Sequence, residues 1–105
     1  MAAVTVFLAQ ENARRTLETG VTTVRDLGSS EYMDIAMRDL IAMGKMIGPR
    51  MFVSGYGLVQ SRTPMRPGTV PAAGGAARGV AEVVRVASQQ VSAGADWVKM
   101  YSVTK

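Results

Sequence analysis

The chain has 105 residues, a net charge of +4 and 48% apolar residues, enough for one folded domain with a core of moderate size. It contains no cysteine, which excludes a disulfide framework and fits a reducing compartment. No apolar run is long enough to span a bilayer, and the N-terminus does not resemble a secretory signal. We therefore expect a cytoplasmic protein without a membrane segment.

The first half of the sequence predicts two helix–strand units. Apolar residues recur at helical spacing over residues 3–19, and Gly20 is suited to end that helix. Residues 21–27 are rich in β-branched side chains and predict a strand. The turn at residues 28–30 offers an N-cap for a second helix over residues 31–43, with Glu31 in its first turn. A second strand follows at residues 50–55.

The second half predicts one further unit after a long loop. Residues 56–75 are rich in glycine, proline, serine and threonine and indicate an irregular connection. An apolar stripe over residues 76–93 predicts the third helix, which Gly94 ends. Residues 97–103 then form a third strand, with Trp97, Lys99 and Tyr101 alternating onto one face.

This order predicts an α/β fold, in one domain over residues 1–105, with three parallel strands that alternate with helices. A three-stranded parallel sheet of this kind leaves two edges and one face open. Another copy of the chain, a partner or a rearranged terminal helix must cover them.

The residue types limit the chemistry. Because histidine and cysteine are both absent, a self-contained zinc enzyme or a serine- or cysteine-based triad is not expected. The acidic residues are scattered, and only Asp26 falls near the carboxyl end of a strand. Gly55 and Gly57 follow a strand, and Gly74 precedes Gly75, but neither pair has the spacing of a phosphate-binding loop, so we interpret them as turn residues.

Basic residues gather where acidic residues are missing. No acidic residue lies between Asp39 and Glu82, an interval that contains Arg62, Arg66 and Arg78. A nucleotide or nucleic acid could bind such residues, but the sequence has no recognised binding module and no basic run interleaved with aromatics. We therefore interpret the interval as a solvated basic surface.

Lys99 is the residue with the most unusual predicted position. If the third strand is central in the sheet, the side chain points into protein, and buried lysines are usually paired, shifted in their titration or chemically recruited. The alternative is a lysine whose stem packs while its ammonium group reaches solvent or Asp26.

Three linked stretches resemble a known family. They are residues 12–28 (NARRTLETGVTTVRDLG), residues 38–58 (RDLIAMGKMIGPRMFVSGYGL) and residues 90–101 (QVSAGADWVKMY). Each is similar to a helix–strand unit of the amidohydrolase superfamily, in the branch of imidazolonepropionase-like and prolidase-like (Xaa-Pro dipeptidase) enzymes. The resemblance covers almost the whole chain.

The resemblance implies part of a (β/α)8 (TIM) barrel, from the first barrel helix to the fourth strand. It implies that Lys99 stands where several members carry a carboxylated lysine that bridges two divalent metal ions such as zinc, which serve amide hydrolysis. The family's His-x-His, its two later histidines and its late aspartate lie outside this chain, and the loop at residues 60–68 lacks the histidine-containing segment of many relatives.

We accordingly expect a piece of a metal-dependent amidohydrolase that binds no metal and is inactive alone. It would pair with the missing barrel part or with copies of itself. The alternative is a non-catalytic α/β module that associates with itself or a partner through open sheet edges and a methionine-rich surface.

Overall fold

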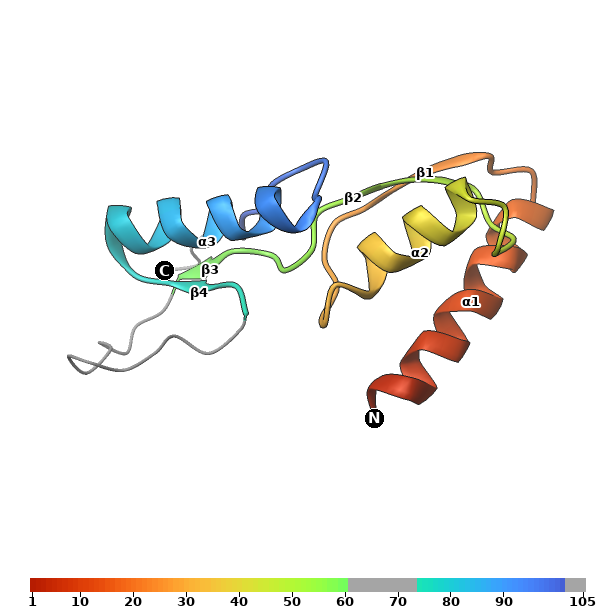
Figure 1. Cartoon of the computed structure of the whole chain (residues 1–105), viewed down its shortest axis with the longest axis horizontal. Helices are drawn as coiled ribbons and strands as arrows, with labels where there is room; N and C mark the ends of the chain where they lie inside the picture. Colours follow the sequence, from red (N-terminus) through yellow and green to blue (C-terminus); the bar gives the residue numbers. More distant parts are fainter. Residues whose placement is uncertain (61–73, 102–105) are drawn as a thin grey trace.

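The computed structural model describes residues 1–60 and 74–101. Helices and strands alternate along most of the chain (Figure 1). The elements are α1 (Ala2–Glu18), β1 (Thr23–Asp26), α2 (Met33–Ala42), β2 (Arg50–Val53), β3 (Val59–Gln60), β4 (Ala76–Ala77) and α3 (Gly79–Ala93). The first two predicted helices and strands are confirmed, with ends that differ by a few residues.

The strands β1 and β2 pair in parallel, with Thr23 opposite Arg50 and Asp26 opposite Val53. This pairing and the crossover through α2 confirm the predicted parallel α/β arrangement for the first two strands. Alternate side chains of the strands face the helices and close an apolar cluster. The cluster consists of Ala13, Ile35, Met37, Met51 and Val53.

A second, smaller cluster lies in the other half of the chain. Leu58, Ala77 and Val86 are buried together where α3 covers the short parallel pair of β3 and β4. Figure 1 shows this half, made of β3, β4 and α3, joined to the half with α1 and α2 by the segment that follows β2. The cluster is small because each of its two strands has only two residues.

The second half differs from the prediction in three places. Residues 76–77 are strand rather than helix, so α3 begins at Gly79. Residues 59–60, expected to be irregular, form β3, and residues 61–73 of that loop, with Arg62 and Arg66, lie outside the described residues. Of the predicted strand at residues 97–103, residues 97–101 form one parallel bridge, between Leu58 and Met100, and residues 102–103 lie outside the described residues.

Local hydrogen bonds explain the reduced third strand. The amides of Asp96 and Trp97 both donate to the carbonyl oxygen of Val53, at 2.8 and 3.1 Å, and pairing resumes only at Leu58. The two amides share one acceptor, so a regular ladder does not form between these points. The segment nevertheless runs beside the end of β2, as the third strand of a parallel sheet would.

The start of α2 also differs from the prediction. The helix begins at Met33 after Glu31 and Tyr32, which have left-handed φ values of 56° and 52°, and no side chain caps it. The amide of Glu31 donates to the Tyr56 hydroxyl at 2.9 Å, and the Tyr32 and Tyr56 rings meet edge to face. Long-range contacts thus replace the predicted serine cap.

Among the helices in the described ranges, none combines the length and the apolar character that crossing a bilayer requires.

Candidate functional site

The carboxyl ends of β1 and β2 lie at the same edge of the sheet because the two strands are parallel. Sites in α/β folds form at this edge. Tyr101 lies against it: a Cβ atom built on Gly28, just after β1, would be 3.4 Å from the Tyr101 hydroxyl, and a side chain at Gly57 would collide with the Tyr101 ring. Glycine at position 57 therefore makes room for this aromatic side chain.

Lys99 is half-buried beside Tyr101, and its Nζ atom lies 5.2 Å from the centre of the Tyr101 ring. Its carbonyl oxygen accepts a 2.7 Å hydrogen bond from the Leu58 amide, which fixes the backbone. Within residues 1–60 and 74–101, no carboxylate forms an ion pair with Lys99, so the contact with Asp26, one of the two alternatives for its ammonium group, is not formed. The role of Lys99 as a metal ligand stays a prediction.

Asp34, in the first turn of α2, is the polar residue that ties the helix to the end of β2. Its side chain is 1% exposed. Its Oδ2 atom accepts hydrogen bonds from the amides of Ser54 (3.3 Å) and Gly55 (2.8 Å), and its Oδ1 atom accepts one from Ile35 (2.8 Å). Both carboxylate oxygens of Asp34 therefore have hydrogen-bond donors from the backbone.

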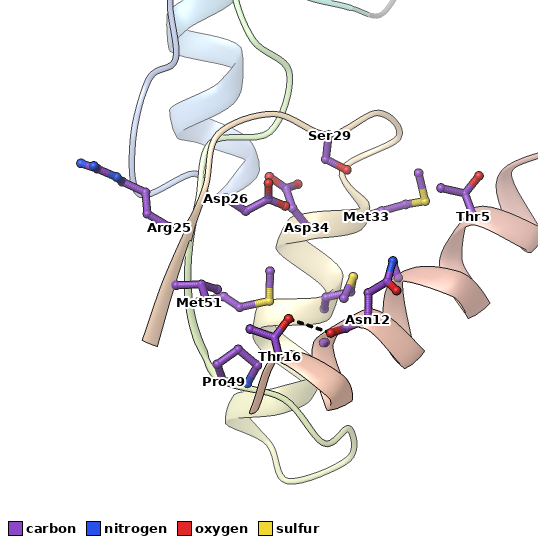
Figure 2. A pocket seen from close by; sticks show the side chains of 14 residues that line it. Thr5, Asn12, Thr16, Arg25, Asp26, Ser29, Met33, Asp34, Pro49 and Met51 are labelled. Carbon is purple, nitrogen blue, oxygen red and sulfur yellow. Dashed lines mark hydrogen bonds between the residues drawn. The ribbon is translucent and has the colours of Figure 1, made fainter. Parts of the chain in front are cut away.

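A cavity of about 400 Å³ opens between α1, α2 and the sheet (Figure 2). Asp26 and Asp34 lie at its upper end, Asn12 and Thr16 come from α1, and Met51 comes from β2. Burial, and next the negative charge of Asp34, raise the pKa of Asp26 above its ordinary value, although a hydrogen bond with the Leu27 backbone opposes them. Asp26 is therefore the carboxyl group whose ionisation this fold disfavours.

The segment that carries Lys99 is anchored by an ion pair with α2. Arg38 Nη1 lies 2.9 Å from Asp96 Oδ2 and also donates to the Gly94 carbonyl, while the same Asp96 oxygen accepts the Val53 amide at 3.0 Å. Burial alone would raise the pKa of Asp96, but the hydrogen bonds from Val53 and Arg38 outweigh it and the pKa lies below its ordinary value. One carboxylate thereby joins α2, β2 and the Trp97 segment.

The described residues do not fit a metal centre by themselves. No three histidine, cysteine, aspartate or glutamate side chains in residues 1–60 and 74–101 converge on a point. The carboxylate oxygens of Asp34 accept hydrogen bonds from backbone amides, and the ammonium group of Lys99 lies over the Tyr101 ring. Any metal chemistry would need ligands from other parts of a protein.

Sequence reasoning missed Asp34 and Gln90. Gln90 is 1% exposed, accepts the Tyr56 amide at 2.9 Å and donates to the Val86 carbonyl at 3.2 Å. Both residues hold the chain just after β2 from opposite helices. Polar residues in otherwise apolar helix faces are the only local signal, and it does not identify their partners.

Comparison with known proteins gives two informative matches among solved structures. An amidohydrolase matches with a TM-score of 0.75 and 31% identity, over 93% of this chain and 27% of that chain. A Xaa-Pro dipeptidase with methionine bound in its active site matches with a TM-score of 0.77 and 32% identity, over 90% of this chain and 26% of that chain. No protein-family model and no curated protein matches significantly.

The fold and these matches define an α/β segment that is similar to part of an amidohydrolase. More particularly, it is similar to part of a Xaa-Pro dipeptidase. The resemblance read from the sequence is thus confirmed. The chain spans about a quarter of the length of each matched structure.

Proposed function

We propose that this chain is the segment of a metal-dependent amidohydrolase barrel from the first barrel helix to the fourth strand, and that the complete protein hydrolyses an amide or peptide bond. The observation that carries this proposal is similarity to an amidohydrolase and a Xaa-Pro dipeptidase over at least 90% of the chain. The parallel pairing of β1 and β2 supports it, because a TIM barrel is built from such units.

Within this proposal, Lys99 is the residue that the chain contributes to the hydrolytic centre, as a carboxylated ligand of divalent metal ions such as zinc. Its position beside Tyr101, near the carboxyl edge of the sheet, is compatible with that role. Bound metal ions would activate water for attack on the amide carbonyl. Because the described residues do not fit a metal centre alone, no step of the reaction is assigned to them.

A chimera tests the proposal. This chain replaces the matching 26% of the Xaa-Pro dipeptidase, and hydrolysis of Xaa-Pro dipeptides is measured with zinc. We expect activity in the chimera and its loss in Lys99→Met, whereas Lys45→Met, at an exposed lysine, serves as the matched control. A folded chimera that keeps full activity with Lys99→Met would contradict the role of Lys99.

The isolated chain gives a second measurement. We expect it to bind no zinc in equilibrium dialysis and to hydrolyse neither Xaa-Pro dipeptides nor acyl amino acids, since it has no histidine ligand. Metal-dependent hydrolysis by the purified chain, abolished by a chelator, would contradict this expectation.

A second candidate function is self-association, with the chain acting as an interaction module. The observation that favours it is apolar exposure on α1 and after α2: Phe7 is 72%, Leu8 60% and Ile47 64% exposed. We expect light scattering to give the mass of a dimer or larger assembly, which Phe7→Gln reduces. Val80→Gln on α3, where Val80 is 82% exposed, is the control. A monomeric wild-type chain would contradict this function.

A further inference from the structure

Lys99 lies on residues 95–101, the Trp97 segment, which is attached to the rest of the chain at two points. Before Lys99, the amide of Asp96 donates to the carbonyl oxygen of Val53 at 2.8 Å. At Lys99 itself, the carbonyl oxygen accepts the Leu58 amide at 2.7 Å. Both partners belong to this chain, so these attachments do not require other parts of a longer protein. Contacts within the chain therefore decide where the backbone of Lys99 lies.

Asp96 binds both backbone groups of the residue that ends β2. Its amide donates to the Val53 carbonyl oxygen, and its Oδ2 atom accepts the Val53 amide at 3.0 Å. Val53 is 0% exposed and belongs to the first apolar cluster, so the carboxylate is attached to a point that the core holds in place. Because no regular ladder forms between Val53 and Leu58, this side chain supplies a contact that strand pairing would otherwise provide.

Arg38 holds Asp96 in this position from α2. Its Nη1 atom lies 2.9 Å from Asp96 Oδ2 and also donates to the carbonyl oxygen of Gly94, the left-handed residue that caps the end of α3. The Arg38 side chain is 20% exposed and that of Asp96 is 32% exposed, so the pair is better shielded from water than the ion pairs on α1. The turn from α3 into the Trp97 segment is thus fixed from a third element.

The attachment at Asp96 determines which way Lys99 points. In an extended chain, successive side chains point to opposite faces and each residue advances the chain by about 3.3 Å. A slip of one residue at Val53 would therefore turn Lys99 to the opposite face. Asp96 acts through the register of the backbone, since the contacts of its Oδ2 atom are with Val53 and Arg38.

We infer that Asp96, held by Arg38, is a positioning residue for Lys99: it sets the register of the Trp97 segment against β2, and thereby the direction in which Lys99 faces the hydrolytic centre. The inference rests on the proposed function, because the direction of Lys99 matters for hydrolysis only if Lys99 is a ligand there. The register itself is a property of the isolated chain. A measurement on the isolated chain and one on the chimera can therefore fail separately.

The contact between Gly57 and Tyr101 measures the register in the isolated chain. A side chain at Gly57 would collide with the Tyr101 ring, so the α-protons of Gly57 lie against that ring. We expect a nuclear Overhauser effect between these protons in the wild-type chain and its loss in Asp96→Ala, while the amides of β1 and β2 keep their signals. Asp96→Asn should restore it, because the asparagine oxygen can still accept the Val53 amide.

Asp39→Ala is the matched control. Asp39 also forms an ion pair with Arg38, at 2.9 Å, but that pair does not involve the Trp97 segment, so the contact of Gly57 with Tyr101 should remain. If circular dichroism shows that Asp96→Ala does not fold, Arg38→Lys takes its place, because lysine keeps the charge but lacks the guanidinium group that joins Gly94 to Asp96. A contact that persists in the folded variant, or that Asp39→Ala also loses, would overturn the inference.

The chimera with the Xaa-Pro dipeptidase connects the register to hydrolysis. We expect Asp96→Ala to lower kcat about a hundredfold, the effect of a displacement of about 1 Å, and we expect Asp96→Asn to recover most of this loss. Asp39→Ala should leave kcat unchanged. Full kcat in Asp96→Ala would overturn the inference even where Lys99→Met is inactive. An unsubstituted chimera without activity would contradict the proposed function instead, and the isolated chain would still decide whether Asp96 sets the register.

Discussion

Asp34 is 1% exposed and accepts hydrogen bonds from three backbone amides. In Asp34→Ala the amides of Ile35, Ser54 and Gly55 lose their acceptor. A buried donor without a partner costs about 1–3 kcal/mol, so we expect the free energy of unfolding to fall by about 3 kcal/mol. Urea denaturation followed by circular dichroism measures the change.

The matched control is Asp39→Ala on the same helix. Asp39 is 54% exposed and its contact with Arg38 is at the surface, where an ion pair contributes about 0–1 kcal/mol. Similar losses in both variants would mean that the three amides find other acceptors.

Asp26 gives a prediction about pH. Its pKa in the folded chain is raised above 3.8, chiefly by burial and next by Asp34, so the folded state binds more protons than the unfolded state. The contribution of Asp26 to stability is then fully present below pH 3.8, and it is lost as the pH rises through the raised pKa. In Asp26→Asn this loss disappears.

We therefore expect Asp26→Asn to be more stable than the wild-type chain at neutral pH and equally stable below pH 3.8, as judged by urea denaturation across that range. Asp96 has the opposite sign, because its lowered pKa makes stability fall as the pH falls. The difference between variant and wild type removes this second effect. A difference that does not change with pH would show that Asp26 titrates normally.

Among the elements, the Trp97 segment depends most on a single side chain. Arg38 joins α2 to Gly94 and Asp96, and its side chain is only 20% exposed. We expect Arg38→Met to lower the free energy of unfolding by about 3 kcal/mol, because it removes two hydrogen bonds of a charged group, which contribute about 1.5–3 kcal/mol each. We also expect the emission of Trp97 to shift to the red. Arg15→Met, where Arg15 is 70% exposed, should change neither.

The sequence predicted the elements best where a single periodic pattern decides the structure. The stripe of α1, the β-branched run of β1 and the caps at Gly20 and Gly94 are all local signals, and the structure confirms them. The sequence-based prediction was wrong at residues 76–77 and 97–101, where backbone pairing with distant residues decides between helix, strand and coil. Local propensity does not contain that information.

The candidate site was predictable only in part. Lys99 was identified from its place in an apolar run and from the family resemblance. Its contact with the Tyr101 ring, and the space for that ring at Gly57, depend on how two segments of the chain pack together. Asp34 and Gln90 were missed for the same reason. Their roles follow from hydrogen bonds to residues more than 15 positions away, such as Gly55 and Tyr56.

On the scale of the whole molecule, the two apolar clusters are joined by a short polar connection. Asp34 and Gln90 secure residues 54–56 by hydrogen bonds, and the Ser54 hydroxyl is buried without a hydrogen-bond partner among the described residues. Such a polar connection couples the folding of the two halves less strongly than a continuous apolar core would, because apolar burial is the main favourable contribution to folding. The chain extends over 48 × 26 × 23 Å, and Figure 1 shows its elongated outline.

We therefore expect the two halves of the chain to unfold at different free energies. We expect native-state hydrogen exchange to detect two cooperative units, with the amides around Val86 exchanging at a lower free energy than those around Val53, because the Leu58 cluster is the smaller one. Exchange of both regions at one common free energy would instead mean that residues 54–57 couple the halves into a single unit. With two units, the half that carries Lys99 would open repeatedly while the rest of the chain stays folded.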